Sequence, residues 1–371
     1  MGYTDRYKEL SAAYSPDISK IRVPGSGITI VNTDFVSDGI SGNLFSGNDY
    51  LITENLTFSY PVMIPAGKSN KVILILHGLN ERSWDKYLLW AETLAEMTGS
   101  FVILFPISFH INRSPVSWKD PRSMLRFLKE KMATRGETRS SSFANIALSN
   151  RLTDDPRRFL KSGYQTVYDL VKLMKQINAG QHPVIPAGGK VNIFAYSIGA
   201  FLAEIIMMAN PDGLFSGSKL FMFCGGSVFS NMRGESKLIM DRLAYEKVYN
   251  YYLERFEDEI KSHGSVLDHL ISGKIGMAFR SMIDFSRFSD VRNIALQNLG
   301  DQVYTIGLKK DQVIPVEGIL RTLSGNTHVE TIDFNYGYTH ENPFPVLNNA
   351  SSTEVDRSFM KIFETAGRFL S

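Results

Sequence analysis

The stretch Lys190-Val-Asn-Ile-Phe-Ala-Tyr-Ser197-Ile-Gly199 decides how this chain folds. A β-rich apolar run ends at Ala195, and an apolar helical run over 200–209 begins directly after Gly199. A serine on a tight turn from strand to helix tolerates only small residues two positions before it and two positions after it. Ala195 and Gly199 meet this requirement. The stretch therefore predicts that the Ser197 hydroxyl lies at a strand tip, beside the first N–H groups of a helix.

The spacing small-x-Ser-x-Gly is that of a nucleophile elbow, with Ala195 in the place of the usual first glycine. Such a short match is weak by itself, because small residues and serine are common. An ordinary strand-to-helix turn that happens to contain a serine is the alternative. The position of Ser197 between a predicted strand and a predicted helix favours the elbow.

Apolar strands alternate with helical stretches along the rest of the chain. We predict further strands over 71–76, 101–106, 219–224, 302–307 and 328–333, and helices over 85–97, 162–178 and 353–370. Strands that are apolar throughout indicate a parallel sheet covered by helices on both faces. The segments 27–35 and 54–61 alternate polar and apolar residues instead, which predicts antiparallel strands at the sheet edge.

Three residues suited to acyl transfer each follow the end of a predicted strand. Serine at its free pKa is a poor nucleophile, so Ser197 needs a neighbouring base. His340, in a loop after the last strand, has the imidazole that can accept and return a proton near neutral pH. A carboxylate behind the imidazole fixes its tautomer. We predict Asp311 for this role, with Asp333 and Glu341 as the alternatives.

This order of Ser197, Asp311 and His340, together with His77-Gly78, resembles the α/β-hydrolase superfamily over roughly residues 27–371. The resemblance implies an α/β-hydrolase fold, with a mostly parallel central sheet, helices on both faces, antiparallel N-terminal strands and a helical cap. It also implies a structural role for His77. The oxyanion hole is expected from the backbone N–H groups of Leu79 and Ile198.

We predict one catalytic domain over 1–371 with two insertions. The first, 107–161, follows the fourth-strand equivalent and holds twelve Lys and Arg against five Asp and Glu. Loops after the strands overhang the active-site edge, so this excess could favour an anionic substrate. A solvated helical surface is the plainer interpretation. We expect the following residues to contact the substrate: Asn80, Arg113, Trp118, Arg122 and Tyr196.

The second insertion, 227–298, contains amphipathic patterns over 238–256 and 266–282. These patterns predict a helical cap or lid whose tyrosines serve core packing more often than ligand binding. If both insertions meet above Ser197, the pocket should be an enclosed apolar cleft with a cationic wall. We then expect the insertions, rather than the sheet, to set specificity.

The composition excludes several classes of function. The chain has 371 residues, 43% of them hydrophobic and 21% charged, with a net charge of +2, which argues against nucleic-acid binding. It shows no apolar signal core and no bilayer-length apolar run, so we expect a cytoplasmic protein. The single Cys224 is expected to be a buried small hydrophobe. No H-E-x-x-H motif, cysteine pair or Gly-rich phosphate loop is present, so no metal or cofactor is predicted.

Three classes of function remain. The first is a serine hydrolase that cleaves a small-molecule carboxylic ester, thioester or amide (the last as a peptidase-like enzyme) through an acyl-enzyme. The second is an acyltransferase that uses the same three residues. The third is a non-catalytic binding protein, which the complete set Ser197, Asp311 and His340 disfavours. Ester hydrolysis is favoured by its frequency within the superfamily.

Overall fold

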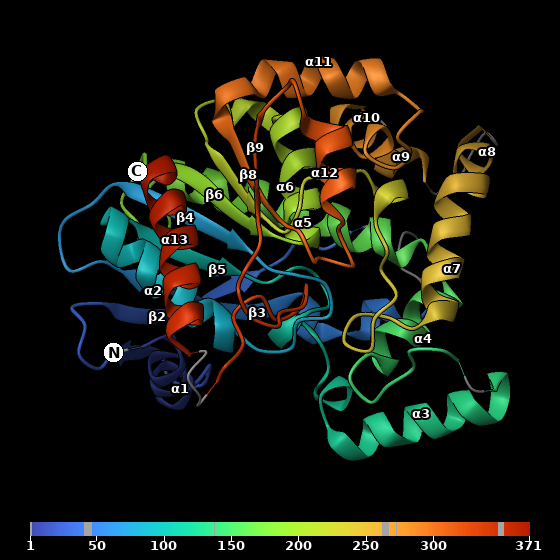
Figure 1. Ribbon diagram of the computed structural model, residues 1–371, viewed down its shortest axis with the longest axis horizontal. Coiled ribbons are helices and arrows are strands. Elements are labelled where there is room, and N and C mark those ends of the chain that lie inside the picture. The colour runs from blue at the N-terminus through green and yellow to red at the C-terminus, as the bar shows by residue number, and fades with distance from the viewer. Residues whose placement is uncertain (1, 41–46, 137, 262–266, 272, 348–351) are drawn as a thin grey trace.

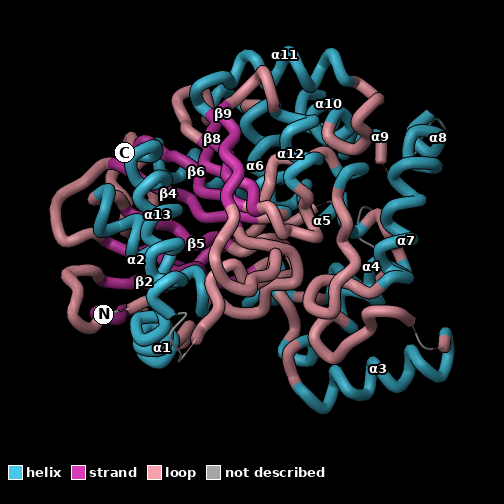
Figure 2. Tube along the Cα trace, viewed as in Figure 1, coloured by secondary structure: helices cyan, strands magenta, loops and turns pink. Residues whose placement is uncertain are grey.

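The computed structural model describes the whole chain except residues 1, 41–46, 137, 262–266, 272 and 348–351. Within the described residues, nine strands form one sheet in the order β1-β2-β3-β5-β4-β6-β7-β8-β9. The strands are β1 (Lys20–Arg22), β2 (Thr29–Val36), β3 (Thr57–Ile64), β4 (Lys71–Leu76), β5 (Phe101–Phe105), β6 (Lys190–Tyr196), β7 (Leu220–Phe223), β8 (Val303–Leu308) and β9 (His328–Ile332). Neighbours from β5 to β9 pair in parallel, and β1, β2 and β3 pair antiparallel at one edge. Figure 2 shows the strands in magenta among the helices in cyan.

Helices cover both faces of the sheet (Figure 1). On one face lie α1 (Tyr3–Ala13), α2 (Asp85–Thr98) and α13 (Ser352–Leu370), and on the other α5 (Arg158–Asn178), α6 (Ile198–Ala209) and α12 (Val316–Leu323). The side chains of each strand alternate between the two cores. Ile73 and Ile75 of β4 face the first layer, whereas Leu74 and Leu76 face the second. Because both faces are covered, the central strands are apolar throughout.

This architecture is the α/β-hydrolase fold and confirms the predicted fold class. The sequence did not predict α1 and β1, because α1 buries few apolar residues and β1 has only 3 residues. The helix predicted over 162–178 begins earlier, at Arg158, since Leu160 extends its buried face. Short helices complete the connections: η2 (Asp49–Leu51), η3 (Thr53–Asn55), η6 (Pro211–Gly213) and η9 (Gly300–Gln302).

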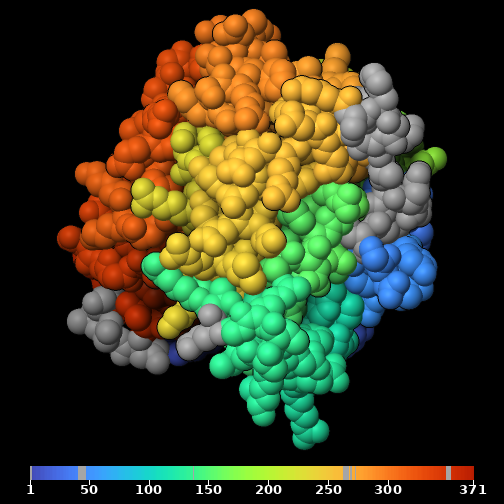
Figure 3. Space-filling model, turned by 90° about the vertical axis from the view of Figure 1, so that its right-hand side faces the viewer, coloured from blue at the N-terminus to red at the C-terminus, as the bar shows by residue number. Residues whose placement is uncertain are grey.

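The segment 107–161 contains η4 (Ile111–Arg113), η5 (Val116–Trp118), α3 (Pro121–Arg135) and α4 (Ile146–Asp154). Helix α3 projects from the body of the molecule (Figures 1 and 3). The segment 227–298 contains η7 (Phe229–Asn231), α7 (Arg242–Asn250), the π-helix η8 (Tyr251–Arg255), α8 (Phe256–Lys261), α9 (Asp268–Ile271), α10 (Gly273–Ser281) and α11 (Ser289–Leu299).

The two helices predicted in the second segment are shifted or more broken than expected. The first begins at Arg242 rather than at 238, because the Asp241 side chain accepts a hydrogen bond from the Ala244 N–H and caps the helix there. The second is divided into α9 and α10, and residues 266 and 272 of the predicted range lie outside the described residues.

The two segments contact each other beside the loop that follows β4. The Asn80 Nδ2 donates to the backbone oxygens of Ala144, 2.9 Å away, and Leu238, 2.6 Å away. A buried ion pair joins Lys131 of α3 to Asp241, the cap of α7. One amide of the β4 loop thus bonds to both segments, which lie together over the C-terminal edge of the sheet.

Candidate active site

Ser197 lies on the turn between β6 and α6 with φ 59° and ψ −123°, a conformation that residues other than glycine rarely adopt. The turn is tight because α6 starts directly against the end of β4. A Cβ at Gly199 would lie 2.4 Å from the Leu76 carbonyl oxygen and 2.7 Å from that of His77. Both atoms belong to the backbone and cannot move aside. The requirement for glycine at 199 therefore comes from this close approach.

Ser197, His340 and Asp311 form one hydrogen-bonded chain. The Ser197 Oγ lies 2.6 Å from His340 Nε2, and His340 Nδ1 lies 2.7 Å from Asp311 Oδ2. All three side chains are buried. A carboxylate only accepts hydrogen bonds, so the imidazole proton sits on Nδ1 and Nε2 is left to accept the serine hydroxyl.

Two backbone N–H groups orient the Asp311 carboxylate. Its Oδ1 accepts from Val313, at 2.9 Å, and from Ile314, at 2.8 Å, so that Oδ2 faces the imidazole. The two alternative acids have other partners. Asp333 accepts from the Tyr338 hydroxyl at 2.9 Å, and Glu341 accepts from the Ser236 hydroxyl. Asp311 is thus the acid that the structure places behind His340.

Tyr196 contacts the His340 loop through both its hydroxyl and its ring. Its hydroxyl donates to the His340 backbone oxygen, and its ring stacks on the imidazole with centroids 5.6 Å apart and planes at 16°. Burial raises the pKa of Tyr196 well above 10, which keeps the hydroxyl a donor. Tyr196 borders the cleft over Ser197, but its polar group is committed to the backbone. The expected contact of Tyr196 with substrate stays a prediction, and the contact that the structure gives its hydroxyl is with the His340 loop.

His77 fixes the loop after β4, as the superfamily resemblance implied. Its Nε2 accepts from the Ile107 N–H at 2.9 Å, so the proton lies on Nδ1, which donates to the Gly78 oxygen at 2.8 Å. Burial lowers the pKa of His77 well below 6.5, so the ring is neutral. The neutral ring ties the β4 loop to the end of β5.

A network that the sequence reasoning missed holds the same loop from α2. The Gly78 N–H donates to the Tyr87 hydroxyl at 2.9 Å, and that hydroxyl donates to Glu81 at 2.8 Å. Lys86 pairs with Glu81 at 2.5 Å and donates to the Glu341 backbone oxygen at 3.0 Å. Lys86 therefore connects the β4 loop to the His340 loop. The signal available in the sequence was the closeness of these residues to His77-Gly78.

Two cavities are lined by Ser197, and a third passes its neighbour Ile198. An open cleft of about 240 Å³ lies over Ser197 and His340, with Asn80 and Arg82 in its walls. An apolar pocket of about 40 Å³ contacts Ser197 on the side of the second segment. A larger apolar cavity of about 100 Å³ passes the side chains of Leu79 and Ile198. These two residues, which we predict to donate to an oxyanion, line both apolar cavities.

Residues 42–371 match a family of unknown function, DUF6051. The chain belongs to this family. None of the proteins with curated descriptions matches the sequence. Among solved structures, this member of DUF6051 is similar to carboxyl esterase 2 from the mycorrhizal fungus Tuber melanosporum, at 10% identity and a TM-score of 0.48, over 99% of this chain and 96% of that chain.

Two further solved structures are similar to this DUF6051 chain. A cold-adapted esterase from an Arctic intertidal metagenomic library has 10% identity and a TM-score of 0.44, over 96% of this chain and 100% of that chain. The Pyrococcus horikoshii acylaminoacyl peptidase has 12% identity and a TM-score of 0.43, over 92% of this chain and 41% of that chain. The fold assignment stands on the sheet topology, because scores this low decide nothing further.

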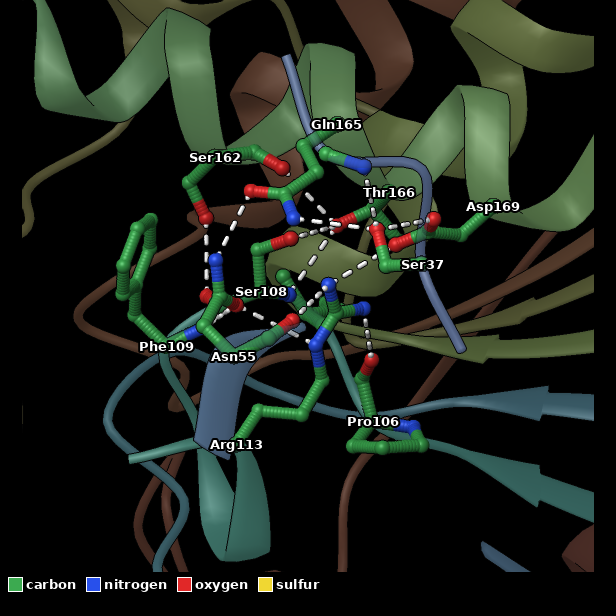
Figure 4. Close-up of polar contacts among 12 residues, drawn as sticks. Ser37, Asn55, Pro106, Ser108, Phe109, Arg113, Ser162, Gln165, Thr166 and Asp169 are labelled. Carbon is green, nitrogen blue, oxygen red and sulfur yellow. Dashed lines mark hydrogen bonds and ion pairs between the residues drawn. The ribbon is translucent and has the colours of Figure 1, made fainter. Parts of the chain in front are cut away.

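Arg113 does not contact the cavities around Ser197, contrary to expectation. Its guanidinium is fully buried and pairs with Asp169 at 2.7 Å (Figure 4). It also donates to the Asn55 side chain at 3.2 Å and to the backbone oxygens of Asn55, at 3.0 Å, and Pro106, at 3.1 Å. A buried cation needs its donors satisfied, and these partners satisfy them. Arg113 is thus a structural residue of this DUF6051 member.

Of the other residues expected to contact substrate, some line a cavity near Ser197 and one does not. Trp118 lines the larger apolar cavity, where the guanidinium of Arg151 stacks on its ring at 4.3 Å. Asn80 lines the cleft, although its amide is engaged by the two insertions. Arg122 is exposed near the start of α3 and lies in none of the three cavities, so for this residue the solvated-surface interpretation holds.

Cys224 is buried, as expected for the only cysteine. Burial and the adjacent Asp311 carboxylate raise the pKa of its thiol well above 9, which keeps it protonated. Across the described part of the chain, no helix has the length and apolar character needed to cross a bilayer. The same residues contain no group of three or more His, Cys, Asp and Glu side chains placed to hold a metal ion.

Proposed function

We propose that this protein is a serine hydrolase that cleaves carboxylic esters through an acyl-enzyme, with Ser197 as nucleophile, His340 as general base and Asp311 as the acid behind it. The hydrogen-bonded chain from Ser197 Oγ through His340 to Asp311 carries the proposal. The position of Ser197 between an open cleft and an apolar pocket, with a larger apolar cavity beside Leu79 and Ile198, supports it, because an ester needs room for both its acyl group and its leaving group.

In the first half of the reaction, the Ser197 Oγ attacks the ester carbonyl carbon while His340 Nε2 takes the hydroxyl proton. The Asp311 carboxylate stabilises the imidazolium that forms. His340 then gives this proton to the leaving alkoxide oxygen as the carbonyl–oxygen bond breaks. The products of this half are an alcohol and an acyl group esterified to Ser197.

In the second half, water replaces the alcohol. His340 Nε2 takes a proton from the water as its oxygen attacks the acyl carbon, and then returns a proton to the Ser197 Oγ as that bond breaks. The carboxylic acid leaves and the hydrogen-bonded chain is restored. Each half passes through a tetrahedral oxyanion.

The oxyanion donors in this proposal are the backbone N–H groups of Leu79 and Ile198. Ile198 is the first residue of α6, and the first N–H groups of a helix have no partner within it. Leu79 follows Gly78, whose position is held by His77 and Tyr87. Removing one such donor typically lowers turnover by about 10²–10³.

The test combines covalent labelling with turnover. A fluorophosphonate probe should label the wild type on the peptide that contains Ser197, and Ser197→Ala should lose both labelling and hydrolysis of p-nitrophenyl acetate. The exposed Ser324→Ala serves as the matched control and should keep both. Labelling at another residue, or full turnover by a folded Ser197→Ala, would refute the proposal. Product analysis with and without an added acceptor alcohol separates hydrolysis from acyl transfer.

A further inference from the structure

The larger apolar cavity contains cations as well as apolar walls. Apolar side chains from α4, α5, α6 and α10 line much of it, among them Phe201 and Phe279. Arg82 and Lys119 also line it, and Arg82 borders the open cleft over Ser197 as well. The same space therefore runs from the predicted oxyanion residues to a pair of positive charges.

Arg82 and Lys119 form no ion pair within the described residues. In the described part of the chain, the Arg82 guanidinium donates only to backbone oxygens, those of Ala144 and Phe143, the latter at 3.4 Å. Glu81 is the carboxylate in the lining of this cavity, but it pairs with Lys86 at 2.5 Å and accepts from the Tyr87 hydroxyl. Both cations are partly buried, so water solvates them only in part. In the described residues, no carboxylate makes up for the water that they lose.

The two charges also destabilise each other. Burial lowers the pKa of Lys119, and the nearby Arg82 lowers it further. Burial likewise lowers the pKa of Arg82. Two like charges that are half removed from water cost free energy, and an anion between them would return part of it.

The remaining cations of the cavity already have a carboxylate. Arg151 contacts Asp49 with both terminal nitrogens, at 2.9 and 3.2 Å, and Arg158 contacts the same carboxylate at 2.8 Å. Two guanidinium groups thus share one carboxylate, so Arg151, Arg158 and Asp49 together still carry one net positive charge. The wall carries a net positive charge with its unpaired members at Arg82 and Lys119.

We propose that the ester cleaved by this protein carries an anionic group, such as a carboxylate, at the end of an apolar acyl or leaving group, and that Arg82 and Lys119 bind this group. The apolar part of the substrate fills the cavity beside Leu79 and Ile198, and the anion reaches the two cations. This inference rests on the proposed function, because it takes Ser197 as the reacting atom. It retains the anionic preference suggested by the sequence but assigns it to other residues.

The experiment compares esters that differ only in terminal charge. One arm places the charge on the acyl group, with mono-p-nitrophenyl adipate against p-nitrophenyl hexanoate. The other places it on the leaving group, with para-carboxyphenyl hexanoate against its neutral methyl ester. The measured quantity is the ratio of kcat/KM for the anionic ester to that for the neutral ester, in wild type, Arg82→Gln, Lys119→Gln and the double variant.

Each single substitution should lower this ratio by about tenfold in the arm that matches the true orientation, since each removes one charge-assisted hydrogen bond. Lys119→Arg should retain most of the ratio. Arg122→Gln removes the same charge from the exposed part of α3 and should leave the ratio unchanged. Added salt should also lower the wild-type ratio, because it screens partly exposed charges.

A ratio unaffected by Arg82→Gln and Lys119→Gln in both arms, or lowered equally by Arg122→Gln, overturns the inference. If that result is obtained while the fluorophosphonate probe labels Ser197 and neutral esters are cleaved, the inference fails and the proposed function stands. If no ester is cleaved, calorimetric titration of Ser197→Ala with monomethyl adipate and methyl hexanoate decides instead. Tighter binding of monomethyl adipate than of methyl hexanoate supports the anion site if the difference disappears when Arg82→Gln and Lys119→Gln are added to Ser197→Ala. Equal binding of the two esters to Ser197→Ala refutes it.

Discussion

Substitution of Asp311 by asparagine should convert His340 to the wrong tautomer while leaving the fold intact. In the wild type, the Asp311 Oδ1 accepts two backbone N–H groups at 2.9 and 2.8 Å, and Oδ2 faces His340 Nδ1. An asparagine that keeps the two backbone bonds must direct its NH₂ group at Nδ1. The imidazole proton then moves to Nε2, which can no longer accept the proton of Ser197.

The amide can restore the productive tautomer only by rotating its NH₂ group toward the two backbone donors. That rotation leaves two buried N–H groups unsatisfied, at about 1–3 kcal/mol each. At about 1.4 kcal/mol for each factor of ten, the productive state is depleted by about 30-fold to 10⁴-fold. Loss of the carboxylate charge that stabilises the imidazolium adds to this. We therefore expect kcat of Asp311→Asn to fall by about 10³–10⁴.

The assay pairs steady-state hydrolysis of p-nitrophenyl acetate with urea unfolding. Asp311→Ala is the comparison, because alanine removes the acceptor of both backbone N–H groups and should lower the free energy of unfolding by about 1–3 kcal/mol for each buried N–H left unmet. Asp311→Asn should unfold close to the wild type. A kcat for Asp311→Asn within tenfold of the wild type, or equal destabilisation by the two substitutions, would refute this reasoning.

Three further predictions concern stability. Gly199→Ala should lower the free energy of unfolding by about 1–3 kcal/mol or more and abolish most turnover, since the Cβ of the alanine meets backbone oxygens. Gly217→Ala, with open space around the new Cβ, should change neither quantity. Arg113→Met should cost about 3–5 kcal/mol by leaving Asp169 buried and unpaired, and adding Asp169→Leu should recover part of this loss in thermal or urea unfolding. Burial lowers the pKa of His182 to about 4 in the fold. As the pH falls below about 6.5, His182 therefore takes up a proton in the unfolded chain before it does so in the fold, and the fold loses stability. Between pH 7 and pH 5, the free energy of unfolding should fall by about 1–2 kcal/mol more in the wild type than in His182→Asn, after a discount for solvent screening.

The sequence predicted the elements whose signals are local. The turn at Ser197 depends on residues within two positions of it, and the strands of a covered parallel sheet are apolar runs that can be read directly. The position of Asp311 followed from the same logic, since it comes directly after β8. Tyr196 and Lys86 act through partners distant in the chain, since the backbone oxygens to which they donate lie 144 and 255 positions away. Such contacts depend on the finished fold and leave no periodic signal.

Arg113 shows why a charge count cannot locate a binding site. The excess of Lys and Arg over 107–161 suggested a positive face, but the partner of Arg113 lies 56 positions further along, outside that range. A sequence shows that a cation is present, and only the fold shows whether a carboxylate meets it. The same ambiguity attached to Trp118, which both lines the cavity and stacks on Arg151.

The fate of the basic residues in 107–161 explains how this insertion is attached. Arg113 pairs with Asp169, Lys131 with Asp241, and Arg151 and Arg158 share Asp49, and these three carboxylates all lie outside the segment. Buried ion pairs add little net stability, but they penalise any other arrangement of the segment, because a misplaced cation would stay buried without its partner. Most of the positive excess therefore orients the insertion over the sheet edge. Among the described residues, Lys119 is the cation of this segment that lines the larger apolar cavity without a carboxylate partner, and it lies near Arg82. The anion site is therefore assigned there and not to the segment as a whole.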